Sequence, residues 1–214
     1  MTTFDALIAT LIGVLAAQAA PGPNLVAVAG AALGQGRSAA LWVVLGIASG
    51  ILVWILAVAA GLGAFLDAYP LSLVLLKFAG GLYLLYIGAK ALLAARSGKG
   101  ATITPAKNKR SAVDAWRHGL LVVLTNPKAA LMWAAVATFL FGAGFTPWQL
   151  IAIGPIGSLT AILIYGTYGI VFSSRVAVAG YAKASWLIEG LFGTIFAALG
   201  GRLLYDGARQ LRSL

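Results

Sequence analysis

Two short polar segments interrupt long apolar stretches of this chain, and their residue types could bind a small charged solute. They are Ala19-Ala20-Pro21-Gly22-Pro23-Asn24 and Thr125-Asn126-Pro127-Lys128. Proline lacks an N–H donor and crowds the preceding turn, so each segment should stop one helix and allow another to begin. Inside a membrane, the backbone groups released there are tolerated only against other protein or a watery cavity. Each segment is therefore a candidate binding site.

Side chains at these segments define a candidate binding set. A broken helix offers free N–H donors to an anionic group at the start of its second half and free C=O acceptors to a cationic group at the end of its first half. We expect Asn24 and Asn126 to brace the breaks, although helix repair alone needs the same geometry. The residues assigned to substrate binding are Gln18, Pro21, Gly22, Pro23, Asn24, Thr125, Asn126, Pro127 and Lys128, and Trp54 and Trp133 are candidates for the pocket lining.

Lys128 is the one charged residue within these two segments, and Glu189 lies early in the last apolar stretch. A lysine deep in a membrane usually faces a bundle interior or a cavity, where desolvation favours loss of its proton. Lys128 could pair with a substrate carboxylate or carry a coupling proton; the alternative is a shallow lysine that snorkels to the interface. Glu189 is the second candidate for proton coupling, although an interfacial role would explain it as well.

The composition is that of a protein that crosses a membrane several times. Of 214 residues, 61% are hydrophobic and 9% are charged, whereas ordinary globular chains carry about 25% charged residues. The chain has no cysteine and one histidine, which excludes disulfides and leaves too few ligands for a metal site. No catalytic residues and no cofactor are expected, so the protein should not be an enzyme.

Six apolar stretches are long enough to cross a bilayer, which takes roughly 20 residues each. They cover about residues 4–33, 38–63, 71–95, 115–141, 148–172 and 184–204, with a loop over 173–183. The expected fold is therefore all-α, a polytopic membrane protein with six transmembrane helices, of which helices 1 and 4 are broken.

The spacing of the breaks predicts an internal repeat. Pro23 and Pro127 lie about half the chain length apart, each in the first of three spans. Because three is odd, the second half enters from the opposite side, which predicts two inverted three-helix repeats. A single transporter domain, 1–214, would contain repeat one (about 1–95), a loop (about 96–114) and repeat two (about 115–214).

Basic residues predict the orientation, because cytoplasmic loops are rich in lysine and arginine. One side carries Arg37, Arg175, Lys183 and the cluster within 96–110; on the other side the turns at 64–70 and 142–147 carry none, and only the tail holds Arg209 and Arg212. The loop 96–114 should be cytoplasmic and both termini outside. A topology signal, together with contact to anionic lipid, explains the cluster better than nucleic-acid binding does, since no aromatic residues interleave the lysines.

Several motifs recur together along the chain. They are Pro21-Gly22-Pro23-Asn24, Gly34-x-Gly36-Arg37, Gly46-x-x-x-Gly50, Gly81-Leu82-Tyr83-Leu84-Leu85-Tyr86-Ile87-Gly88, Gly119-Leu120 and Asn126-Pro127-Lys128-Ala129-Ala130. Over nearly the whole chain they closely resemble the LysE/RhtB family of amino-acid exporters. The resemblance implies a multi-pass exporter of amino acids or related metabolites in the bacterial inner membrane, driven by proton antiport. The chain departs from the family at Phe139–Phe145, where a Phe-Leu-Pro-Gln-Phe-like segment is usual, so the substrate cannot be inferred from the resemblance.

Two alternatives are open. One is a channel or transporter for ions or other small solutes on a related scaffold; the other is a membrane-embedded enzyme or assembly factor, for which the sequence offers no intramembrane pair of acids. The expected partners are an amino-acid-like substrate, protons and membrane lipids, without nucleic acid. Small-residue surfaces such as Gly46-x-x-x-Gly50 allow close helix contact within the fold or across a homodimer.

Overall fold

The computed structural model describes residues 3–62, 71–97, 103–106 and 109–212, and every regular element among them is a helix. The helices are α1 (Thr3–Ala19), α2 (Pro23–Gln35), α3 (Arg37–Ala57), the π-helical turn η1 (Val58–Leu62), α5 (Leu71–Arg96), α6 (Ala112–Leu124), α7 (Pro127–Gly142), α8 (Pro147–Val171) and α9 (Arg175–Leu211). The all-α prediction is confirmed. The predicted turn at 64–70 and parts of the predicted loop, 98–102 and 107–108, lie outside the described residues.

Both predicted breaks are present. The chain bends by 50° between α1 and α2 and by 61° between α6 and α7. Pro23 and Pro127 each begin the helix after a break, where the missing N–H is harmless because the first N–H groups of a helix have no intrahelical partner. By length and apolarity, four helical segments of the described chain could cross a membrane, namely Arg37–Gly61, Lys77–Arg96, Pro147–Val171 and Arg175–Leu211, or up to six if each bent pair is one span.

The predicted loop at 173–183 is wrong over most of its length. α8 ends at Val171 and α9 runs without interruption from Arg175 to Leu211, so only residues 173 and 174 of the predicted loop lie outside a helix. The hydrophobic pattern predicted only the segment suited to lipid, residues 184–204. A helix can extend beyond such a segment, because its backbone hydrogen bonds do not require apolar side chains. The 37 residues of α9 correspond to about 55 Å of helix measured along its axis, which exceeds the roughly 30 Å thickness of a hydrocarbon core. The helix is therefore longer than the predicted transmembrane segment.

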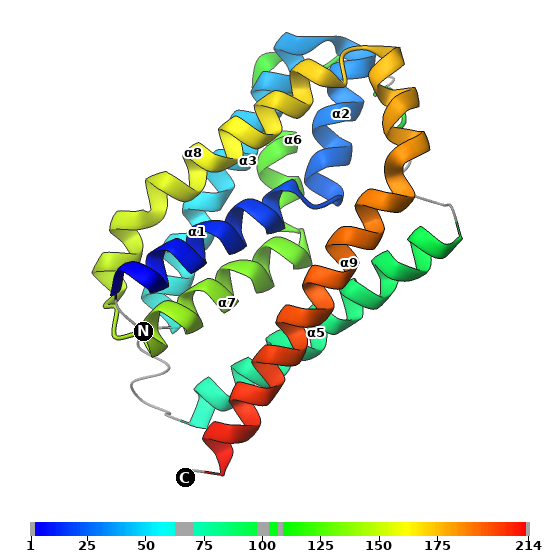
Figure 1. Ribbon diagram of the computed structural model, residues 1–214. Helices are drawn as coiled ribbons and strands as arrows, with labels where there is room; N and C mark the ends of the chain where they lie inside the picture. Colours follow the sequence, from blue (N-terminus) through cyan, green and yellow to red (C-terminus); the bar gives the residue numbers. More distant parts are fainter. Residues whose placement is uncertain (1–2, 63–70, 98–102, 107–108, 213–214) are drawn as a thin grey trace.

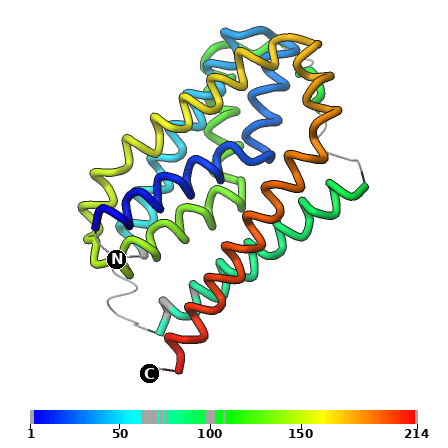
Figure 2. Tube along the Cα trace, in the orientation of Figure 1, coloured from blue at the N-terminus to red at the C-terminus, as the bar shows by residue number. Residues whose placement is uncertain are grey.

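Two groups of helices make up the described molecule (Figures 1 and 2). α1, α2, α3, α6, α7 and α8 form a bundle in which α3 packs on α6 and α8, while α5 and α9 run side by side along one flank, where α5 contacts α7. The bundle core is apolar and includes Val28, Val43, Ile47, Ile51, Leu140 and Leu150. Both breaks lie near the middle of the molecule, with the α2–α3 turn toward one end and the termini toward the other (Figure 1).

Glycines bring helix backbones close together at two interfaces. An added Cβ at Gly46 of α3 or at Gly119 of α6 would collide with the backbone of the other helix. On α5 and α9, an added Cβ at Gly81 would lie 3.0 Å from the Gly200 carbonyl oxygen, and one at Gly200 would lie 2.7 Å from the Gly81 carbonyl oxygen. The close contact expected of Gly46-x-x-x-Gly50 is therefore made within the fold.

Two adjacent glycines of α9 give a matched test of this packing. A Cβ at Gly200 would also lie 2.9 Å from the Leu85 backbone nitrogen, whereas a Cβ at Gly201 would meet nothing within 4 Å. Gly200→Ala should lower the free energy of unfolding by about 1–3 kcal/mol, because α5 and α9 must separate. Gly201→Ala should raise it by up to about 1 kcal/mol through helix propensity. Thermal unfolding of the purified variants measures both, and equal melting temperatures would contradict the close contact.

Candidate functional site

The two breaks contact each other directly through their asparagines, both of which are buried. Asn126 Nδ2 donates a hydrogen bond to Asn24 Oδ1 at 3.1 Å, and Asn24 Nδ2 donates to the Tyr165 hydroxyl oxygen at 3.2 Å. Asn126 Oδ1 accepts a hydrogen bond of 3.0 Å from the Lys128 backbone N–H and so caps α7. Asn126 thus caps the helix that follows its own break and also bonds to the first break. Asn24 connects the first break both to the second break and to α8.

Lys128 reaches from the second break to the first. Its Nζ donates to the carbonyl oxygens of Ala20 at 3.0 Å and Pro21 at 3.3 Å, and it lies 5.3 Å from the centroid of the Phe196 ring. Those carbonyl groups follow the end of α1, where intrahelical donors run out, so the ammonium group supplies the missing bonds. The aromatic ring adds a cation–π attraction. The Lys128 ammonium group therefore lies between the breaks, near the middle of the molecule.

α8 supplies further partners of the first break. The Tyr168 hydroxyl donates to the Ala19 carbonyl oxygen at 2.7 Å, and Gln18 Nε2 donates to the Gly157 carbonyl oxygen at 3.0 Å. Sequence reasoning missed Tyr165 and Tyr168. The available signal was a pair of phenol groups three residues apart in an apolar span, a spacing that places both on one helix face.

A small polar cavity, the break cavity, lies between the two breaks. Its lining includes Gln18, Asn24, Asn126, Lys128, Trp133 and Tyr165. Its volume of about 20 Å³ suits about one water molecule. Gln18 Oε1 and Trp133 Nε1, an acceptor and a donor, are buried without a hydrogen-bond partner among the described residues. The break cavity can hold a water molecule but is too small for an amino acid.

A larger cavity lies between the breaks and the α5–α9 pair. It measures about 540 Å³, within the range of about 300–1,000 Å³ typical of small-molecule sites. Its lining includes Pro21, Gly22, Pro23, Asn126, Pro127 and Lys128 from the breaks, Tyr83, Tyr86 and Lys90 from α5, and Glu189, Phe192 and Phe196 from α9. We call it the Lys128–Glu189 cavity.

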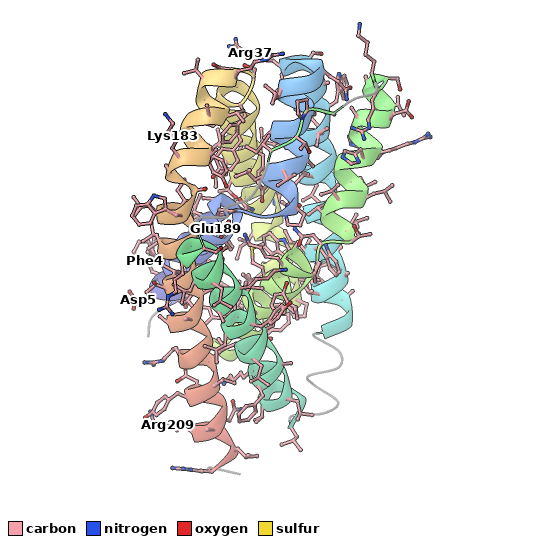
Figure 3. All side chains as sticks on the ribbon, turned by 90° about the vertical axis from the view of Figure 1, so that its right-hand side faces the viewer. Phe4, Asp5, Arg37, Lys183, Glu189 and Arg209 are labelled. Atoms are coloured by element: carbon pink, nitrogen blue, oxygen red, sulfur yellow. The ribbon has the colours of Figure 1, made fainter. Side chains whose placement is uncertain are left out.

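The Lys128–Glu189 cavity presents charges of both signs. Lys128 and Glu189 come from different groups of helices and interact electrostatically. Figure 3 shows Glu189 about half-way along the molecule, between Arg37 near one end and Arg209 near the other. A cation and an anion in the lining of one cavity are the complement of a zwitterion.

Two of the predicted residues lie outside the linings of both polar cavities. Thr125 is exposed, and its hydroxyl donates to the Leu121 carbonyl oxygen at 2.7 Å, within α6 and its end. Trp54 Nε1 donates to the Val123 carbonyl oxygen at 3.0 Å, so it supports α6 beside the break cavity. Trp133 lines the break cavity and also a separate apolar cavity of about 190 Å³ between α1, α7 and α8. The other predicted site residues, Glu189 included, line one or both polar cavities.

These features define a class: a helical membrane protein of several spans, in which two broken helices meet at polar cavities. The sequence model of the family described as LysE type translocator matches residues 15–207. The chain belongs to this family, so the resemblance noted in its motifs is confirmed, and it is a transporter rather than an enzyme.

The chain is similar to efflux proteins of enteric bacteria. It is 29% identical over 189 residues to the threonine efflux protein of Escherichia coli strain K12, covering 86% of this chain and 90% of that protein. It is 26% identical over 188 residues to the threonine efflux protein of Salmonella typhi, with the same coverage. It is 29% identical over 125 residues to the leucine efflux protein of Salmonella typhimurium strain LT2, covering 58% of each chain. No solved structure matches the chain significantly.

Proposed function

We propose that this protein exports amino acids or closely related small metabolites across the bacterial inner membrane by proton antiport. Membership of the LysE type translocator family and the similarity to threonine and leucine efflux proteins support this substrate class. The observation that carries the proposal is the bridge from Lys128 to Ala20 and Pro21, beside a cavity that also contains Glu189.

The substrate carboxylate would bind at Lys128 and at the start of α2. Gly22, the residue before α2, provides no side-chain cap, so backbone N–H groups of the first turn can donate to an anion. A carboxylate that pairs with Lys128 competes with the carbonyl oxygens of Ala20 and Pro21 for the same ammonium group. Substrate binding would thereby weaken the hydrogen bonds between the two breaks. Occupancy of the site by substrate would in this way be coupled to movement of the helices that meet at the breaks.

Glu189 would provide the coupling to protons. Its carboxylate can hold the substrate ammonium group when ionised, or a proton when neutral, but not both. Mutually exclusive binding of two ligands to one group is sufficient for exchange, because the group must release one ligand before it takes the other. The same residue would therefore serve both substrate binding and coupling.

The helix arrangement supports two inverted repeats as the architecture of this transporter. The third spans of the two halves, α5 and α9, pack together, as do the second spans, α3 and α8, and the broken spans meet at Asn24 and Asn126. Arg37 and Lys183 lie toward one end of the molecule and Arg209 toward the other (Figure 3). We assign the Arg37 end and the loop 96–114 to the cytoplasm, and both termini to the outside, from the excess of basic residues.

Counterflow tests the proposed function. Proteoliposomes loaded with an unlabelled amino acid should accumulate the same labelled amino acid, in a panel that includes L-threonine and L-leucine. An imposed proton gradient should accelerate net export if the transporter is an antiporter. The absence of counterflow with every amino acid and derivative tested would refute the proposal. Ion conductance by the same proteoliposomes would then favour a channel.

Glu189→Gln tests the coupling. Glutamine keeps the shape of the side chain but cannot ionise, so the acceleration of export by a proton gradient should vanish, and the affinity for substrate should fall. Asp114→Asn is the matched control, since Asp114 is an exposed acid in the first turn of α6, and it should respond to the gradient as the wild-type protein does. An undiminished gradient response in Glu189→Gln would assign coupling to another group.

A further inference from the structure

A third polar cavity lies farther along the interface between α7 and the α5–α9 pair. It measures about 860 Å³, and Lys77, Thr138, Phe139, Leu203, Asp206 and Arg209 are among its lining residues. Arg209 is close to the end of α9, near the end of the molecule opposite Arg37 (Figure 3). We call it the Arg209-end cavity.

The Arg209-end cavity also presents charges of both signs. Lys77 Nζ donates to Gln210 Oε1 at 2.6 Å, and Asp206 Oδ2 accepts a hydrogen bond of 3.1 Å from Arg202 Nε. Thr138 is only 4% exposed, and its hydroxyl has no hydrogen-bond partner among the described residues. Two cations and a carboxylate in the lining of one cavity suit a small ligand with its own donors and acceptors.

The two cavities follow each other along the same faces of the same helices. On α7, Lys128 lines the first cavity and Ala135 the second; on α9, Phe196 lines the first and Leu203 the second. Each pair is separated by seven residues, two helical turns, which keeps the side chains on one face about 10 Å apart. α5 contacts α7 along this interface, and the two cavities lie one after the other between α7 and the α5–α9 pair.

We propose that the Arg209-end cavity is a second binding site for the exported amino acid, occupied after the Lys128–Glu189 cavity. The proposal rests on the proposed function above. Arg209 and Lys77 bind the carboxylate there, and Asp206 binds the ammonium group. The solute therefore passes along α7, between the bundle and the α5–α9 pair.

The absence of cysteine from the sequence makes a thiol-protection experiment direct. Ala135→Cys places a single thiol in the wall of the Arg209-end cavity, and Ala91→Cys places one in the wall of the Lys128–Glu189 cavity. Each purified full-length variant is reacted with a maleimide in nanodiscs, with and without the amino acid that gives counterflow. Ala143→Cys, at the same cavity as Ala135 but exposed, replaces Ala135→Cys if that variant does not fold.

The amino acid should slow modification at both positions. Adding Arg209→Gln should raise the concentration needed to protect Ala135→Cys by about two- to fivefold, the effect of one lost ion pair, and leave protection of Ala91→Cys unchanged. Protection of Ala91→Cys alone would overturn the second site while leaving the proposed function intact. If the protein shows neither counterflow nor protection of either thiol, both the proposed function and the second site are refuted.

A lipid headgroup is the other source of an anion for Arg209 and Lys77. Glycerol phosphate therefore serves as a separate protectant of Ala135→Cys. Protection by the amino acid and not by glycerol phosphate supports a solute site. Protection by glycerol phosphate alone would overturn it in favour of lipid binding.

Discussion

Lys128→Met should reduce counterflow about a hundredfold or more. Methionine matches the length of lysine but donates no hydrogen bond, so the carbonyl oxygens of Ala20 and Pro21 lose their links to α7. Hydrogen bonds to a charged group contribute about 1.5–3 kcal/mol each, and every 1.4 kcal/mol corresponds to about a factor of ten. The substrate carboxylate would lose its cationic partner at the same time. Initial rates of counterflow, normalised to folded protein, provide the measurement.

Lys90→Met is the matched control for this substitution. Lys90 lines the same cavity but is an exposed residue of α5, so its loss should change counterflow by no more than about threefold, as for a weakly interacting surface charge. Lys128→Arg keeps the charge and should retain part of the activity. If Lys128→Met counterflows at the wild-type rate, Lys128 has no part in transport. If it fails to fold while Lys128→Arg folds and transports normally, the role of Lys128 is charge and bracing rather than specific recognition.

Asn126→Ala should lower the free energy of unfolding by about 2–4 kcal/mol. The substitution removes the cap of α7, worth about 1 kcal/mol, and leaves the buried Oδ1 of Asn24 without its partner, at a further cost of about 1–3 kcal/mol. Asn24→Ala should also destabilise, because the Nδ2 group of Asn126 then has no acceptor on Asn24. The double variant should be more stable than the sum of the single changes predicts, by about 0.5–3 kcal/mol of coupling. Reversible denaturation of the four proteins gives this energy directly.

Thr125→Ala is the control for a substitution close to the break. Thr125 is exposed, and the hydrogen bond described for its side chain is local, to the Leu121 carbonyl oxygen at the end of α6. It should shift stability by less than about 0.5 kcal/mol. Additive effects of Asn24→Ala and Asn126→Ala would contradict the direct bond between the breaks. Substrate affinity in the folded variants separates bracing from binding, because a pure brace leaves that affinity unchanged.

The breaks could be predicted because their causes are local. Proline lacks a donor wherever it stands, so Pro23 and Pro127 mark new helix starts without reference to the rest of the chain. The length of α9 could not be read in the same way, because apolarity reports which residues suit lipid and not where a helix ends. Its first turns, from Arg175, are helical although the charges of Arg175 and Lys183 led to their assignment as a loop.

The candidate site was predictable only in part. Lys128 stood out because a charge inside an apolar stretch is costly unless it is paired. Tyr165 and Tyr168 did not stand out, because an aromatic residue in a span is usually explained by packing alone. Their roles depend on bonds to Asn24 and Ala19, which lie far away in the sequence. Trp54 was a reasonable candidate by position, but its indole faces the backbone of α6 at Val123.

By itself, the sequence determined that the chain is all-helical with several apolar spans and two proline breaks. It also determined which types of side chain are available at each break. These features follow from composition and from local backbone chemistry. Only the tertiary structure decided that the breaks meet through Asn24 and Asn126, and that Lys128 reaches Ala20 and Pro21 beside a cavity containing Glu189. The bonded residues lie more than 100 positions apart. Their meeting depends on how whole helices pack, which no local pattern specifies.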